Sequence, residues 1–169
     1  MSAKREGGPK PPKGSCVVVC LGNPLMRDDG AGLEVARARR RIDLGSHVLI
    51  LERQTTDLSL LADAEEASKF VIVDAAVAGN RPGTVARLSL GVWLRGRLKL
   101  RLSHELGLAD LLSLTKAVGI PSASVTLVVV EPEDCSPGEG LSKPVANAIP
   151  SMVGEVVDAI CGRSHGPRP

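Results

Sequence analysis

Short aliphatic runs alternate with longer amphipathic stretches along most of this chain. The runs have the length of strands and contain almost no polar residues, which is typical of parallel strands buried on both faces. The longer stretches place apolar residues at helical spacing. We therefore predict strands over residues 16–22, 47–53, 70–76, 85–90 and 124–132. Helices are predicted over residues 33–42, 59–67, 104–119 and 143–161.

This order of elements predicts an α/β fold, a three-layer α/β/α sandwich around a mostly parallel twisted sheet. Residues 85–90 resemble an edge strand, and the β-branched run 124–132 is expected at the centre of the sheet. In the last helix, Ser142 is a predicted N-cap and Pro144 suits the first turn. Ligands of such sheets bind outside the carboxyl ends of the strands, so residues that follow strands are the first candidates for a site.

The two ends of the chain differ from the rest in composition. Residues 1–14 and 162–169 are rich in Gly, Pro and basic residues, and we expect them to be disordered tails. Residues 15–161 are expected to form one domain, since a chain of 169 residues leaves no room for a second.

The amino-acid composition excludes some classes of binding partner. Aromatic residues are 1% of the chain and there is no Tyr, which removes the stacking platforms that bind single-stranded nucleic acid. The net charge is only +2, so nucleic acid is not expected as a partner. The four cysteines show no metal-ribbon spacing and are expected to be reduced thiols. No apolar run reaches the ~20 residues of a membrane helix, so we expect a cytoplasmic protein without a membrane partner.

Two adjacent acids, Asp28 and Asp29, stand among glycines between the first predicted strand and the first helix. An Asp in this position can cap the helix N-terminus. The two side chains point in different directions, so one can cap while the other faces a cleft. The loop lacks both the P-loop ending and the GxGxxG spacing, and two carboxylates repel phosphate. The sequence therefore favours cations at this loop.

Asp74 ends a predicted strand that is otherwise aliphatic, which places its carboxylate at the carboxyl edge of the sheet, beside the first loop. Burial of a carboxylate is costly unless it is paired or bound to a ligand. One interpretation is that Asp74 binds a ligand. The other is that it caps the turn formed by residues 75–79. The sequence leaves both open.

His104 begins the predicted helix 104–119, and of the three histidines it is the one placed to meet these acids. His47 opens a strand and His165 lies in the C-terminal tail. Two carboxylates and one imidazole suit a divalent first-row metal and leave positions open for water or substrate. No GxSxG elbow is present, and no Cys is placed where a His would activate it, so a Ser or Cys nucleophile is poorly supported.

Four segments, in this order, resemble the hydrogenase maturation proteases, the endopeptidases that trim the large subunit of nickel-iron hydrogenases. They are GNPLMRDDGAG after the first strand, FVIVDA at the third, SHELGLADLLSL with its histidine, and a late strand running into EP followed by GLSKPV. The resemblance covers roughly residues 16–161 and implies that residues 15–161 are a catalytic domain of this kind.

The resemblance implies that the enzyme recognises nickel already inserted in the hydrogenase large-subunit precursor and then removes a short C-terminal peptide. Asp29, Asp74 and His104 fall at the three ligand positions of the family. The expected cofactor is therefore nickel supplied by the substrate. Arg27 is a departure, because small residues are frequent at that position.

Neither the residues nor the resemblance supplies an obvious nucleophile. In one hypothesis, Asp29, Asp74 and His104 bind the nickel of the substrate, and water polarised there or by a free carboxylate attacks the peptide. In another, nickel is only a checkpoint and one Asp is the general base. A non-enzymatic module would use the same residues to hold nickel for delivery. In the simplest alternative, every one of these acidic residues only caps the end of a helix or a turn.

Overall fold

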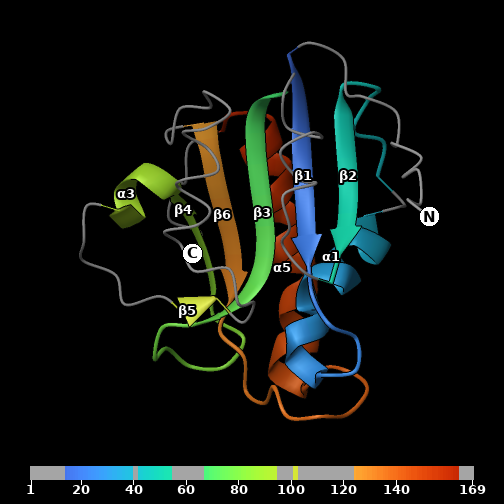
Figure 1. Cartoon of the computed structure of the whole chain (residues 1–169), viewed down its shortest axis with the longest axis vertical. Helices are drawn as coiled ribbons and strands as arrows, with labels where there is room; N and C mark the ends of the chain where they lie inside the picture. Colours follow the sequence, from blue (N-terminus) through green and yellow to red (C-terminus); the bar gives the residue numbers. More distant parts are fainter. Residues whose placement is uncertain (1–13, 40–41, 55–66, 95–100, 103–123, 164–169) are drawn as a thin grey trace, which may run out of the picture.

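The computed structural model describes residues 14–39, 42–54, 67–94, 101–102 and 124–163 (Figure 1). The strands are β1 (Ser15–Leu21), β2 (Val48–Arg53), β3 (Ala67–Val77), β4 (Val85–Ser89), β5 (Arg101–Leu102) and β6 (Val125–Val130). The helices are the 3-10 turn η1 (Arg27–Gly30), α1 (Ala31–Arg39), α3 (Leu90–Leu94) and α5 (Lys143–Ile160).

The strands form one sheet along the path β2-β1-β3-β6-β4. β1 is parallel to β2 and β3, and β3 is parallel to β6. The edge strand β4 is antiparallel to β6, and the short β5 pairs with the end of β3. The predicted α/β class, the mostly parallel sheet and the edge strand over residues 85–90 are confirmed. β6 is an interior strand, but the centre of the sheet is β3.

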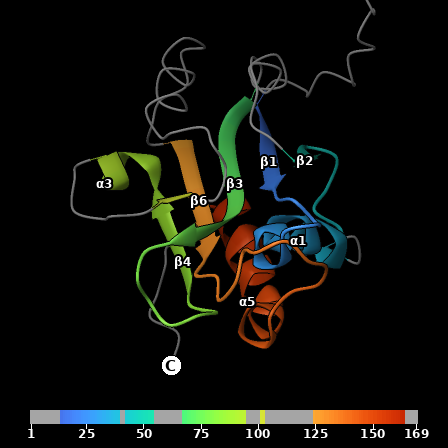
Figure 2. The same ribbon diagram turned by 60° about the horizontal axis from the view of Figure 1, so that its bottom comes forward.

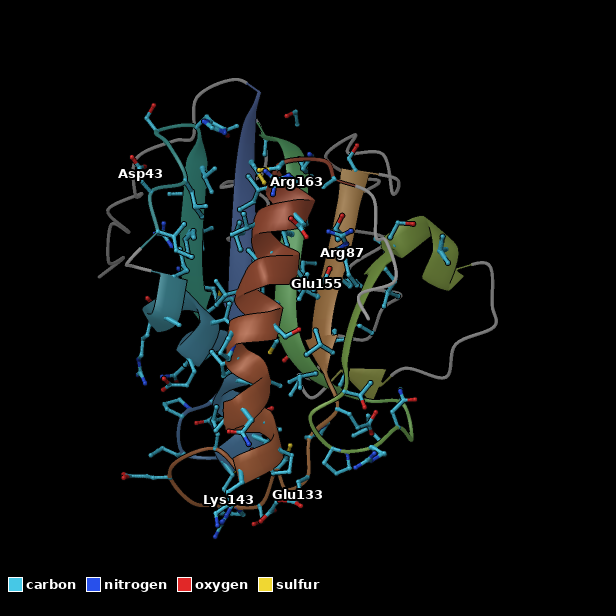
Figure 3. All side chains as sticks on the ribbon, turned by 180° about the vertical axis from the view of Figure 1, so that it is seen from behind. Asp43, Arg87, Glu133, Lys143, Glu155 and Arg163 are labelled. Carbon is cyan, nitrogen blue, oxygen red and sulfur yellow. The ribbon has the colours of Figure 1, made fainter. Side chains whose placement is uncertain are left out.

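Both faces of the sheet are buried, because the alternating side chains of its strands are aliphatic on each side. α1 and α5 cover one face, and α5 lies across it in Figure 3. The largest buried side chains of that face include Val18, Val71, Val128 and Met152. On the other face a second cluster joins Val17, Ile72, Leu127 and Leu90, the first residue of α3.

Helix α5 forms where the sequence predicted it, and Pro144 lies in its first turn. Its predicted apolar stripe is confirmed, with Val145, Ile149, Met152, Val153 and Val156 buried and Ile160 partly buried. The prediction for Ser142 is wrong in its chemistry. Ser142 occupies the N-cap position, but its side chain makes no capping hydrogen bond and its hydroxyl donates to Asp28.

Strand β3 differs most from its predicted range. It begins at Ala67 and ends at Val77, whereas the predicted range is 70–76, and Asp74 lies inside the strand instead of at its end. The extension forms because Ala76 and Val77 pair with β5, a contact from distant sequence. α1 begins at Ala31, earlier than predicted. Apart from Ala67, which opens β3, the predicted helices 59–67 and 104–119 lie outside the described residues.

The predicted tails also lie almost wholly outside the described residues, which begin at residue 14 and end at residue 163. All four cysteines are free thiols, as predicted. Among the described helices, none combines the length and the apolar character needed to cross a membrane.

Candidate active site

Two loops meet at the carboxyl edge of the sheet, below β1 and β3 in Figure 1 and turned forward in Figure 2. The first loop, residues 22–30, links β1 to α1, and the second loop, residues 131–142, links β6 to α5. Their backbones are joined directly. The N–H of Arg27 donates to Gly138 O at 2.9 Å, and the N–H of Gly138 donates to Leu25 O at 2.8 Å. The edge is therefore built from both halves of the chain.

Two glycines let the first loop and α1 approach the strands closely. A Cβ on Gly32 would lie 2.1 Å from the carbonyl oxygen of Leu21 and 2.7 Å from that of Val73. A Cβ on Gly22 would lie 2.6 Å from the carbonyl oxygen of Asp29. The start of α1 thus rests on the ends of β1 and β3, which brings the first loop to the position next to Asp74.

Asp28 holds the two loops together. It is fully buried, and its Oδ2 accepts hydrogen bonds from the N–H groups of Glu133 and Asp134 at 2.8 and 3.0 Å. Its Oδ1 accepts from the N–H of Ser142 at 2.7 Å, and the Ser142 hydroxyl donates to Oδ2 at 2.8 Å. Four donors stabilise the ionised carboxylate, because hydrogen bonds to a charged group are the stronger kind. Asp28 therefore connects the loops and does not cap α1.

Asp29 points elsewhere, as the sequence predicted for one of the two acids. Its side chain is 7% exposed, and Oδ2 accepts a hydrogen bond of 2.9 Å from the N–H of Asn23. Asn23 in turn accepts at Oδ1 from the N–H of Leu25. These bonds fix the turn that precedes η1, and they place the Asp29 carboxylate at the end of β1.

Asp74 is fully buried within β3 at the same edge. Its Oδ1 accepts a hydrogen bond of 2.8 Å from the N–H of Ala75. Ala75 is the first residue of the segment that Asp74 would cap, and the later residues of that segment are bound by Glu131. The Glu131 carboxylate accepts from the N–H groups of Ala78 and Gly79 at 2.9 and 3.1 Å.

Sequence reasoning missed this role of Glu131, although the Glu-Pro pair that ends β6 was part of the resemblance. The side chain of Glu131 is buried, and its backbone N–H donates to Thr84 O. The only sequence signal for this role is an acidic residue directly after an apolar strand. That signal does not reveal which turn the carboxylate binds. The pairing of residues 53 positions apart is a tertiary feature.

The pKa of the Cys135 thiol responds to these acids, and the structure alone identifies this cysteine. Burial, together with the charges of Asp29, Asp28, Asp134 and Asp74, raises the pKa of its thiol to about 11. The thiol therefore lies within the electrostatic reach of acids from both loops and from β3. A thiol with this pKa is protonated at neutral pH, so the structure adds no support for Cys135 as a nucleophile.

Arg27 is the residue of the first loop that departs from the family pattern, and its contacts show how the loop accommodates it. Its φ of 46° lies in the left-handed region, where residues other than Gly are uncommon. Its N–H bond to Gly138 holds the backbone, and its Nε lies 3.3 Å from Asp134 Oδ2. The side chain leans against the second loop, so the larger residue adds a contact between the loops.

A groove of about 1010 Å³ lies on the helical side of the first loop. It runs between α1 and α5, and its walls include Leu25, Arg27, Arg37 and Glu139. Leu25 is 61% exposed, which is unusual for a large apolar side chain. The groove and the carboxylates thus border the first loop from different sides.

The structure brings Asp29 and Asp74 to one edge, whereas His104 lies outside the described residues. Within the described residues, no three His, Cys, Asp or Glu side chains are grouped to hold a metal ion. The two carboxylates can bind a cation and accept a proton, and a complete metal site would need further ligands.

Comparison with known protein families gives one clear match. The model of the hydrogenase maturation protease family matches residues 34–159, which include Asp74 and His104 and begin after Asp29. The hydrogenase 2 maturation protease of Escherichia coli strain K12 is 32% identical over 85% of this chain and 89% of its own length. A hydrogenase expression/formation protein, HupD of Rhizobium leguminosarum, is 30% identical over 92% of this chain and 78% of its own length.

Solved structures agree with these matches. The hydrogenase maturating endopeptidase HybD of Escherichia coli superimposes with a TM-score of 0.74 at 30% identity, covering 88% of this chain and 93% of that one. The nickel-iron hydrogenase maturation protease HybD of Thermococcus kodakarensis gives a TM-score of 0.66 at 25% identity, covering 84% and 96%.

Proposed function

This chain belongs to the hydrogenase maturation protease family and is an endopeptidase, and from that premise we propose that it acts on the nickel-loaded precursor of a nickel-iron hydrogenase large subunit. The proposed reaction is removal of a C-terminal peptide. The observation that carries the proposal is the pair of buried carboxylates, Asp29 and Asp74, at the carboxyl edge of a parallel sheet. Ligands of such sheets bind at that edge.

In this proposal the nickel is part of the substrate. Asp29, Asp74 and His104 bind it and leave other coordination positions for ligands of the precursor. Carboxylate and imidazole are suitable ligands for a divalent first-row metal. Because the precursor supplies the remaining ligands, the isolated enzyme needs no complete metal site. Recognition then depends on nickel having been inserted, so processing follows nickel insertion.

Cleavage needs a water molecule and a group that accepts its proton. We propose that water polarised at the nickel site attacks the scissile carbonyl carbon, that a carboxylate of the site takes the proton, and that the proton passes to the leaving amine when the C–N bond breaks. Asp29 and Asp74 are the carboxylates available for this role at the edge. In the checkpoint version, nickel only positions the precursor and one Asp alone is the base.

The test replaces the three residues singly, Asp29→Asn, Asp74→Asn and His104→Gln, and measures both docking to the nickel-loaded precursor and its cleavage. Each change is expected to weaken docking and to lower the cleavage rate by about 100-fold or more, as is usual when a metal-binding residue is lost. Asp43→Asn is the matched control, because Asp43 is exposed and lies at the opposite end of the molecule from Glu133 in Figure 3. If His104→Gln docks normally but does not cleave, the checkpoint version is wrong.

The family match decides against the non-enzymatic delivery module, because the chain resembles proteins named as proteases over most of its length. The alternative in which every acid is a cap predicts that Asn at Asp29 or Asp74 lowers stability and leaves the cleavage rate per folded molecule unchanged. Denaturant unfolding of each variant, run beside the cleavage assay, separates these two results.

A further inference from the structure

The end of the sheet opposite the candidate active site is polar on the face that α5 covers. On that face the buried positions of β3 and β6 are aliphatic, at Val71, Val73, Val128 and Val130. One step further along the same alternation stand Lys69 in β3 and Thr126 in β6. Ser89 pairs with Thr126 in register and adds a second hydroxyl. α5 ends at Ile160, beside Lys69.

These polar residues line a cavity of about 350 Å³. The strands contribute Lys69, Arg87, Leu88, Ser89 and Thr126 to its lining, and the end of α5 with the residues after it contributes Ala159, Gly162 and Arg163. The charged residues of this lining are all basic. Figure 3 shows Arg87 and Glu155 between β4 and α5, with Arg163 beyond the end of the helix, and Glu133 and Lys143 at the opposite end of the molecule.

Arg87 is the central group of this cavity, and its side chain is only 7% exposed. Its Nε lies 3.3 Å from Glu155 Oε2, and its Nη2 donates to the carbonyl oxygen of Arg163 at 3.0 Å. The Nη1 atom is buried and donates to no acceptor in the described part of the chain. A buried donor without an acceptor is destabilising, so the Arg87 guanidinium keeps hydrogen-bonding capacity beyond its contacts with Glu155 and Arg163.

The charges around the cavity leave one cation in excess. Glu155 pairs with Arg87, and Asp158 pairs with Arg163 at 3.3 Å. The Lys69 ammonium instead donates to the carbonyl oxygens of Ala159 and Ile160 at 3.3 and 3.1 Å. Those bonds use two of its three protons. Within the described residues no carboxylate pairs with Lys69.

We propose that this cavity binds an oxyanion, a phosphate group or a carboxylate, held by Lys69, Arg87 and Thr126. The lining offers donors to a ligand and almost no acceptors, since the nearby carbonyls of Ala159, Ile160 and Arg163 already accept hydrogen bonds from Lys69 and Arg87. A site of this kind favours ligands whose oxygen atoms carry negative charge. It lies at the end of β3 away from Asp74, so it is independent of the proposed cleavage reaction.

The test is a titration of the full chain, labelled with ¹⁵N, with inorganic phosphate and separately with acetate, at constant ionic strength set with chloride. Saturable shifts of the amide signals of Ser89, Thr126 and Gly162 are expected, with a dissociation constant on the order of 1 mM. Saturation by phosphate alone identifies a phosphate site, and saturation by acetate as well identifies a site that also takes a peptide carboxylate. Saturation by neither ion overturns the proposal.

Two variants locate the ion. Lys69→Met is expected to weaken binding roughly tenfold, because it removes the unmatched charge. Thr126→Val keeps every charge and the shape of the side chain and is expected to weaken binding about threefold, so it serves even if Lys69→Met unfolds. Lys143→Met, at the far end of α5, is the charge-matched control and should bind within about twofold of the wild type. Equal affinity in all four proteins would contradict the site.

Discussion

Two neighbouring acids in the first loop have different tasks, and only one of them is a candidate for chemistry. Asp28 uses both of its oxygens to hold the second loop, whereas Asp29 contacts the turn at Asn23. The sequence predicted that the two side chains would diverge. It could not predict which acid would be structural, because the partners of Asp28 are more than 100 residues away along the chain.

Replacement of Asp28 by Asn should lower the free energy of unfolding by about 2–3 kcal/mol. The amide has one acceptor oxygen, and its NH₂ group faces donors, so buried N–H groups lose their partner. Guanidinium unfolding followed by circular dichroism measures the loss. Asp43→Asn is the control, since Asp43 Oδ1 accepts a single bond from the N–H of Gly45 in an exposed turn, and a change below about 1 kcal/mol is expected. Equal losses at both positions would contradict the role given to Asp28.

Cys135 provides a probe of the carboxylates. Because burial and the charge of Asp29 raise its pKa to about 11, its thiol should be alkylated slowly at pH 8. The raised pKa means that the folded chain holds the proton more tightly, so the rate should increase about tenfold per pH unit and level off only above pH 11. Iodoacetamide labelling followed by peptide mass spectrometry measures the rate, and Cys161, which is exposed, is the internal comparison.

Asp29→Asn removes the largest charge effect on Cys135 and should speed its alkylation, whereas Asp43→Asn should not change it. If Cys135 reacts as fast in the folded chain as in guanidinium at pH 8, the fold does not raise the pKa of its thiol.

At the level of elements, the sequence predicts a strand well where a local run of aliphatic residues specifies it. It does not predict residues that join a strand only through pairing with distant sequence. The aliphatic runs of β1, β2 and β6 specify buried strands by themselves. Val77, the last residue of β3, lies beyond the predicted range and pairs with Arg101 of β5, a contact that leaves no mark in the run itself. Asp74 is therefore held inside a strand, where its position is more rigid than at a strand end.

The contact between α1 and the strands requires Gly32. Gly32→Ala should lower stability by about 3 kcal/mol, because its Cβ would overlap backbone atoms of Leu21 and Val73, which cannot rotate away. This outcome opposes the helix propensity, which favours Ala over Gly. Gly30→Ala is the matched control, since the nearest atom to its Cβ would be 3.4 Å away, and its stability should stay within about 1 kcal/mol of the wild type. Thermal unfolding of both variants tests the contact.

At the scale of the whole molecule, the two ends of the sheet are both polar and carry different charges. The carboxyl edge gathers acids from both loops, and the opposite end gathers basic side chains around the end of α5. The α/β class followed from the alternation of elements, which is a global pattern and tolerates errors at each boundary. The basic cavity did not follow, because its residues belong to β3, β4, β6 and α5 and meet only in the folded chain.

The measurement that tests the central claim most directly is the mass of a hydrogenase large-subunit precursor after incubation with this protein, once loaded with nickel and once without. Loss of a C-terminal peptide from the nickel-loaded form alone is the predicted result, and Asp74→Asn should abolish it. Cleavage of both forms would show that nickel is not the recognition element. Intact mass for several nickel-loaded precursors would contradict the proposed reaction.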